Sequence, residues 1–186
     1  VLKDDGDYKG AEVEINEYIN KGGKKTDEID KIIGDITNIS HFEKAVEYLK
    51  DEPKKAIELL LPLSEEFNEN PLVYYYLGVG YRRIENYNKA IHYLNKSLTI
   101  ESGSLETVNE LGMNYACIGE YEEAIKYFRK AFEASKEVEI CTNIVMCYIN
   151  LGDKEQAKIH LELAKKIAPE DDIVIEIDQM LNRTIK

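Results

Sequence analysis

Residues 74–98 read YYYLGVGYRRIENYNKAIHYLNKSL, and residues 108–132 read VNELGMNYACIGEYEEAIKYFRKAF. The two stretches share one pattern, Leu-Gly-x2-Tyr followed after a short break by Tyr-x2-Ala. Gly78 and Gly112 mark the same place in each copy and lie 34 residues apart. A third, looser copy covers residues 141–169. Repetition at a fixed period of this length predicts an array of small structural units rather than one ordinary domain.

Each copy predicts two antiparallel helices. On both sides of the break, apolar residues recur every three or four positions, which is the spacing of one helix face. Gly78 and Ala90 fall where the two helices would cross most closely. Glycine costs about 1 kcal/mol relative to alanine inside a helix, so its presence within an apolar stripe indicates close packing. One such hairpin cannot bury both of its faces, and the sequence therefore predicts an all-α stack of hairpins.

The period and the residues Leu-Gly-x2-Tyr and Tyr-x2-Ala resemble those of the tetratricopeptide repeat (TPR) family. The resemblance is specific over residues 71–171. It implies a right-handed α-solenoid of antiparallel helix pairs, in which the first helix of each repeat lines a concave groove. It also implies a protein–protein interaction module, a scaffold or adaptor that binds a peptide or a partner helix in that groove.

Nine residues occupy the groove-facing places that the resemblance implies: Tyr75, Val79, Arg82, Arg83, Asn109, Met113, Thr142, Met146 and Asn150. The lining is mixed, and methionine and tyrosine are side chains that suit varied partners. Two structural alternatives stay open. Met113 and Met146 would serve equally well as packing between neighbouring repeats, and the two arginines would pair with Glu106 or Glu110 on the next helix.

The rest of the chain is expected to be helical as well. We divide the whole into N-terminal helices with the remnant of a truncated repeat (1–39), a degenerate repeat (40–70), three well-formed repeats (71–171) and a C-terminal capping helix (172–186). Such a cap is what a repeat array needs to cover its last apolar face.

Local signals set the expected helix ends outside the strong repeats. Thr26 is a suitable N-cap, and Gly22-Gly23 ends the helix before it. Ser40-x2-Glu43 matches a capping box and favours a break between two helices near residues 37–40, with one continuous helix over 27–50 as the alternative. Pro62 lies inside an apolar helical stripe, where it predicts a kink or a loosened turn.

The composition argues against several classes of function. A net charge of −12 over 186 residues disfavours nucleic acid as a partner, which needs clustered Lys and Arg. No run of about 18 apolar residues exists, so neither a membrane-spanning helix nor a membrane partner is expected. Cys117, Cys141 and Cys147 are an odd number without a C-x-x-C spacing. They fit reduced core thiols and a cytoplasmic location better than a disulfide framework or a zinc site.

No catalytic, cofactor or metal site is expected, so the chain is not predicted to be an enzyme. The histidines His41, His92 and His160 are scattered, and none has a partner at a ligand-like spacing. Phosphate-binding glycine loops and nucleophile motifs are missing. Besides the adaptor, two functions remain open: a docking or regulatory arm of a larger enzyme or regulator whose active part lies upstream, and a self-assembly unit that forms homo-oligomers.

Overall fold

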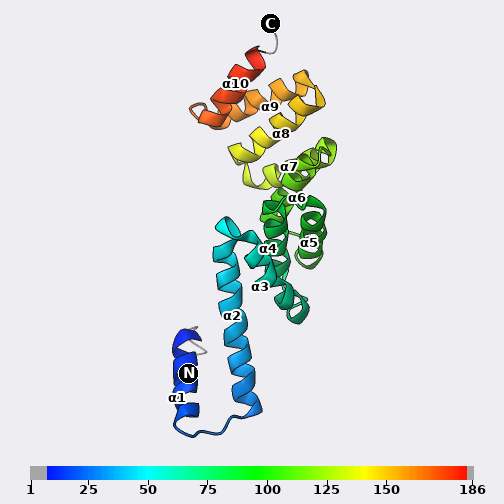
Figure 1. The fold of residues 1–186 in the computed structure, drawn as a ribbon. Helices are drawn as coiled ribbons and strands as arrows, with labels where there is room; N and C mark the ends of the chain where they lie inside the picture. Colours follow the sequence, from blue (N-terminus) through cyan, green and yellow to red (C-terminus); the bar gives the residue numbers. More distant parts are fainter. Residues whose placement is uncertain (1–7, 184–186) are drawn as a thin grey trace. The chain divides into compact units, whose positions relative to one another are not determined.

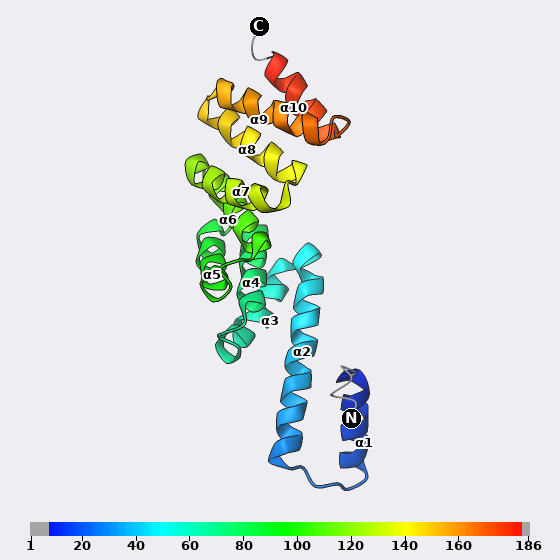
Figure 2. The same cartoon turned by 180° about the vertical axis from the view of Figure 1, so that it is seen from behind.

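A computed structural model describes residues 8–183, and helices are the only regular secondary structure in that range (Figure 1). Figure 2 shows the same helices from behind. The chain divides into two compact units, Val1–Asn68 and Glu69–Lys186. The predicted all-α fold class is confirmed.

The first unit contains α1 (Tyr8–Asn20), α2 (Asp27–Asp51) and α3 (Pro53–Glu66). Its helix ends follow the expected local rules. The Ile29 N–H donates to the Thr26 hydroxyl oxygen at 3.3 Å, which caps α2. Gly22 takes a φ of 88° just after α1, the left-handed conformation that ends many helices. Pro53 opens α3, where its missing N–H leaves no intrahelical hydrogen bond unmade.

The helix break expected near residues 37–40 is wrong, because α2 runs through this point without interruption. The Thr37 hydroxyl donates to the Ile33 carbonyl at 2.8 Å, the bond that a threonine makes in a helix interior. The buried residues of α2 lie on both sides of Ser40: Ile36, Ala45 and Leu49. Burial of an apolar face on both sides stabilises one continuous helix and outweighs a capping signal worth about 1 kcal/mol.

Pro62 lies inside α3 without ending it, and the helix continues to Glu66. The side chain of Pro62 is exposed. Four residues of the same helix are buried: Ala56, Ile57, Leu60 and Leu63. The proline removes one backbone hydrogen bond, and burial of these side chains holds the helix together across it.

The second unit is a stack of antiparallel helix pairs followed by a single helix (Figure 1). Its elements are α4 (Pro71–Arg83), α5 (Tyr87–Ile100), α6 (Leu105–Cys117), α7 (Tyr121–Ser135), α8 (Val138–Leu151), α9 (Lys154–Ile167) and α10 (Asp172–Arg183). α4, α6 and α8 are the first helices of the three repeats, and α5, α7 and α9 are the second helices. This arrangement is the α-solenoid that the sequence predicts.

Glycine is required where the first two hairpins cross. A Cβ atom at Gly78 would lie 2.5 Å from Cγ of Leu94, and one at Gly112 would lie 2.7 Å from Cδ1 of Phe128. Leu94 and Phe128 are buried in the close-packed interior and have no room to move aside. The predicted close crossings are therefore confirmed, with a large side chain of the second helix packed directly on each glycine.

α10 ends the second unit. The N–H groups of Ile173 and Val174 donate to the Asp171 carboxylate at 2.9 and 3.1 Å, as expected for a helix N-cap. Its buried residues, Val174, Ile177 and Leu181, join Cys141 and Val145 of α8 and Ala157, Leu161 and Ala164 of α9 in one apolar cluster. The last helix thus covers the apolar face of the third hairpin.

Candidate functional site

The first helices form the inner layer of the array. α4 contacts α6 and α6 contacts α8, whereas consecutive second helices do not approach one another to the same extent. A stack that is tighter along one row of helices curves toward that row. The inner surface is therefore made by α4, α6 and α8, the helices that the sequence assigns to the groove.

The nine predicted groove residues differ in how far they reach this surface. Arg83, Met146 and Asn150 are exposed, and Tyr75, Arg82, Asn109 and Met113 are half-buried. Val79 and Thr142 are buried, and the Thr142 hydroxyl donates to the Glu139 carbonyl of its own helix. Val79 and Thr142 therefore support the surface from below, and the other predicted residues supply its exposed atoms.

Arg82 of α4 and Glu110 of α6 form a two-pronged ion pair. The Arg82 Nε–H donates to Glu110 Oε2 at 2.7 Å, and an Nη2–H donates to Oε1 at 3.1 Å. The Glu110 side chain is 9% exposed and that of Arg82 is 25% exposed. Burial lowers the pKa of Arg82, but the hydrogen bond and the charge of Glu110 outweigh it and raise the pKa overall. Arg82 thus pairs with a glutamate of the next helix, as the structural alternative predicted, and joins neighbouring repeats. Arg83, in contrast, is exposed.

Tyr75 lies in the electric field of this pair. Burial first, and then the negative charge of Glu110, raise the pKa of Tyr75 to about 12. The ring also meets that of Tyr76 edge-on, with the two centroids 5.1 Å apart. The phenol of Tyr75 therefore stays protonated near neutral pH and can donate a hydrogen bond at the inner surface.

The junction between the first two repeats is polar. Thr107 is buried, and its hydroxyl oxygen lies 3.4 Å from Oγ of Ser97 and 2.8 Å from Oγ of Ser104. Asn114 is buried as well, and its Nδ2 donates to the Glu110 carbonyl at 2.8 Å. The Oδ1 atom of Asn114 has no hydrogen-bond partner within the described range. Buried polar groups lower stability unless they are hydrogen-bonded, so the polar contacts at this junction distinguish it from an ordinary apolar one.

The corresponding junctions further along the array are apolar. The places of Thr107 and Asn114 are taken in α8 by Ile140 and Cys147 and in α10 by Val174 and Leu181, all of them buried. The sequence contains the signal for this difference. Thr107, Glu110 and Asn114 are polar residues at the three- and four-residue spacing of a buried helix face, and reading them together would have predicted the polar junction.

The two predicted methionines have different environments. Met113 packs against the apolar cluster of the second hairpin, which includes Val108 and Phe128. Met146 is 36% exposed on α8. Met113 therefore packs within the second hairpin but is only half-buried, while Met146 exposes apolar surface on α8.

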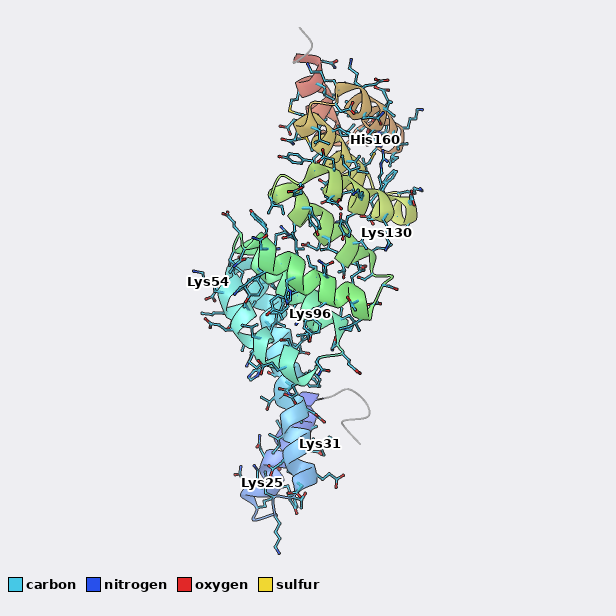
Figure 3. The ribbon with its side chains drawn as sticks, turned by 90° about the vertical axis from the view of Figure 1, so that its right-hand side faces the viewer. Lys25, Lys31, Lys54, Lys96, Lys130 and His160 are labelled. Carbon is cyan, nitrogen blue, oxygen red and sulfur yellow. The ribbon has the colours of Figure 1, made fainter. Side chains whose placement is uncertain are left out.

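The second helices present a different surface. Each repeat places a tyrosine of its first helix against a ring of its second helix: Tyr81 with Tyr93 at 5.4 Å, Tyr115 with Tyr127 at 5.3 Å and Tyr148 with His160 at 5.1 Å between centroids. Basic side chains accompany these rings, as with Lys96 over Tyr93 at 5.6 Å. Figure 3 shows Lys96, Lys130 and His160 on these helices. The rings contact one another within each hairpin, which identifies them as packing residues of the hairpin.

Within residues 8–183, no three His, Cys, Asp or Glu side chains come together in a way that could hold a metal ion. No helix in that range is long and apolar enough to cross a membrane. The three cysteines are unpaired, and Cys117 is exposed. Burial raises the pKa of Cys141, and that of Cys147 to about 11, so these two thiols are inert core residues.

Models of the tetratricopeptide repeat match residues 72–103, 106–137 and 138–171, which are the three hairpins of the second unit. The chain is 28% identical over 103 residues to a TPR repeat-containing protein of Methanocaldococcus jannaschii, covering 55% of this chain and 18% of that protein. It is 26% identical over 102 residues to the photosystem I assembly protein Ycf3 of Prochlorococcus marinus, covering 53% of this chain and 58% of Ycf3. The chain thus spans less than two thirds of either curated relative.

Several solved structures share the fold. MamA AMB-1 superposes with a TM-score of 0.68 at 19% identity, covering 81% of this chain and 84% of MamA. MamA of Desulfovibrio magneticus RS-1 gives 0.71 at 16% identity over 77% and 81% of the two chains. A chain of the APC/C hetero-tetramer Cut9–Hcn1 gives 0.70 at 17% identity over 92% of this chain and 35% of that one. At these low identities the solved structures show a shared fold. The three matched repeats cover more than half of the chain and show that it belongs to the tetratricopeptide repeat family.

Proposed function

We propose that the chain is a protein–protein interaction module that binds a peptide or a partner helix on the inner surface of α4, α6 and α8. One observation carries the proposal, namely the side chains that line this surface. Tyr75 and Met146 present apolar area there, beside the polar Arg83 and Asn150. Aromatic residues, methionine and arginine are the types enriched at protein interfaces. The hairpins' own cores do not need these four side chains at the surface.

Two similar proteins support a scaffold role by analogy. Ycf3 is named for the assembly of photosystem I, and Cut9 was solved in a hetero-tetramer with Hcn1. Members of this family act as protein-interaction scaffolds in general. Because the analogy rests on the fold, the partner of this chain has to be identified from the chemistry of its own surface.

A second role, as a segment of a larger protein, is favoured by the greater length of one relative. The chain covers only 18% of the Methanocaldococcus jannaschii protein, so a TPR segment of this kind can belong to a much larger polypeptide. In that case the inner surface would be the docking arm of a larger enzyme or regulator. We also propose a cytoplasmic location, because unpaired thiols are typical of a reducing compartment.

Matched single substitutions test the binding surface. Met146 on α8 and Leu163 on α9 are 36% and 38% exposed, so a charge at either position leaves the buried core intact. A partner captured with the wild-type chain is purified and titrated against Met146→Glu and Leu163→Glu. We expect Met146→Glu to bind about tenfold more weakly or worse, because a charge in an interface centre is strongly unfavourable. Loss of binding in Leu163→Glu alone would assign the interaction to the second helices and refute the proposal.

A further inference from the structure

All three methionines of the chain stand at the same place of successive inner helices. Met113 lies in α6, Met146 follows 33 residues later in α8, and Met180 follows 34 residues later in α10. Met146 and Met180 are 36% and 37% exposed, and Met113 is half-buried. Equivalent residues of stacked repeats align along one surface of the array, and these three therefore form a row, here called the methionine track.

The burial pattern places α10 in the same register as α8. Ile140 and Cys147 of α8 are buried in the apolar cluster of the second hairpin. The residues 34 positions later, Val174 and Leu181 of α10, are buried in the cluster of the third hairpin. The same 34-residue step leads from Met146 to Met180. In this register, α10 takes the place that a fourth inner helix would have after α9.

The charge on the helices of the methionine track is negative. α6 and α8 contain no Lys, Arg or His, and α10 contains none before Arg183. Glu106, Glu139 and Glu176 are exposed on these three helices. The second helices α7 and α9 differ, because both carry several Lys or Arg residues. A negative surface on one row of helices favours partners of the opposite charge.

We infer that α6, α8 and α10 bind a basic, amphipathic polypeptide segment along the methionine track. Its apolar side chains contact Met113, Met146 and Met180, and its Lys or Arg side chains face the exposed glutamates Glu106, Glu139 and Glu176. Methionine suits this role because its unbranched, polarisable side chain fits varied apolar shapes. The inference rests on the proposed binding of a polypeptide to the inner surface. It adds the chemistry of the partner and the participation of α10.

The methionines themselves supply the readout. The chain of residues 1–186, labelled with ¹³C at the methionine methyl groups, gives three methyl signals, one for each residue of the track. Single Met→Leu variants assign them. The probes are two synthetic peptides of equal length with leucines at i, i+3, i+4 and i+7; one carries Lys and the other Glu at the remaining positions. We expect the Lys peptide to shift all three signals saturably and the Glu peptide to shift none.

Fluorescence anisotropy of the labelled Lys peptide, titrated with variants of the chain, measures how much the methionines and the glutamates each contribute to binding. Met180→Ala and the double variant Glu139→Lys/Glu176→Lys should each weaken binding about fivefold or more. Leu163→Ala removes a similarly exposed apolar side chain from α9 and should bind as wild type does.

The outcomes separate this inference from the proposed function. If the Lys peptide shifts Met113 and Met146 but not Met180, α10 lies outside the site and the inference fails, while binding to the inner surface stands. If the Glu peptide binds equally well, or if neither peptide shifts any signal, the assigned partner chemistry is wrong. If a captured natural partner also binds Met146→Glu normally, the proposed function fails as well.

Discussion

The ion pair between Arg82 and Glu110 allows a quantitative test of how the candidate site is built. Its two hydrogen bonds measure 2.7 and 3.1 Å. In Arg82→Met, the Glu110 carboxylate would keep a side chain only 9% exposed and lose its counter-charge. Breaking a fully buried pair in this way costs about 3–5 kcal/mol. Because Arg82 is 25% exposed, water can partly replace it, and we expect a loss of about 2–3 kcal/mol.

The reverse substitution, Glu110→Met, should cost less. The Arg82 guanidinium that remains sits on a long flexible stem and can turn toward water, so we expect a loss of about 1–2 kcal/mol. The double variant Arg82→Met/Glu110→Met leaves no unpaired charge. Apolar side chains of similar volume replace buried ion pairs with little net change, and the double variant should lie within about 1 kcal/mol of wild type.

Urea unfolding followed by circular dichroism measures these differences, with hydrogen exchange in α6 as a local probe because a repeat array can unfold in stages. The coupling between the two substitutions is the decisive quantity. If Arg82→Met unfolded within about 0.5 kcal/mol of wild type, or if the double variant lost the sum of the single losses, the pair would not join the two repeats and the reasoning would be refuted.

Three further predictions concern the array. Gly112→Ala should destabilise by about 1–3 kcal/mol in urea because its Cβ would lie 2.7 Å from the Phe128 ring; Gly34→Ala, with nothing within 4 Å, should instead stabilise by up to about 1 kcal/mol. Since the folded pKa of Tyr75 is about 12 and the ordinary value is 10.0, its contribution to stability is present below pH 10 and lost toward pH 12. Tyr75→Phe should therefore lose less stability than wild type over that interval in pH-dependent melting. Deleting residues 172–186 should lower the melting temperature and promote aggregation while the spectrum stays helical, and an unchanged melting curve would contradict the capping role.

The hairpins were predictable from the sequence because their geometry admits few residues. At Gly78, even a Cβ atom would come within 2.5 Å of Leu94. The close approach of the two helices therefore requires glycine there, and the glycine is visible in the sequence. The left-handed turn residues Gly119 and Gly152, with φ of 83° and 76°, are another case. Glu85 takes the equivalent left-handed place in the first hairpin with a φ of 60°, so the turn favours glycine without requiring it, whereas the helix crossing leaves no space for a side chain.

The helix through Ser40 was not predictable in this way. A capping box is a local signal, and the same residues are tolerated inside a helix when their side chains bond to the preceding turn, as Thr37 does with Ile33. Which outcome prevails depends on burial of residues such as Ile36 and Ala45 against the rest of the unit. That burial is a property of the packed structure, and the sequence pattern does not contain it.

The exposed fraction of each side chain in the candidate site could not be predicted from the sequence, for a related reason. Helical spacing places Val79 and Thr142 on the same face as Met146, but it does not say how deeply each side chain is covered by the neighbouring helix. Val79 and Thr142 are 8% and 3% exposed, against 36% for Met146. The helical repeat shows which face of a helix a residue lies on. The solvent accessibility of its side chain depends in addition on the distance between neighbouring helices.

In the proposed binding mode, α10 serves both as a cap and as an inner helix. Within residues 8–183, two faces of α10 have no neighbouring helix: one toward the place that a following second helix would take, and one toward the inner surface. On the first face, Ile144, Val145 and Tyr148 of α8 are replaced in α10 by Asp178, Gln179 and Asn182, with Ile175 as the apolar exception. Solubility alone would make the second face polar as well. That face instead keeps Ile173 and Met180, which are 52% and 37% exposed. The exposed Ile173 and Met180 on the inner side support the proposed contact of α10 with a partner.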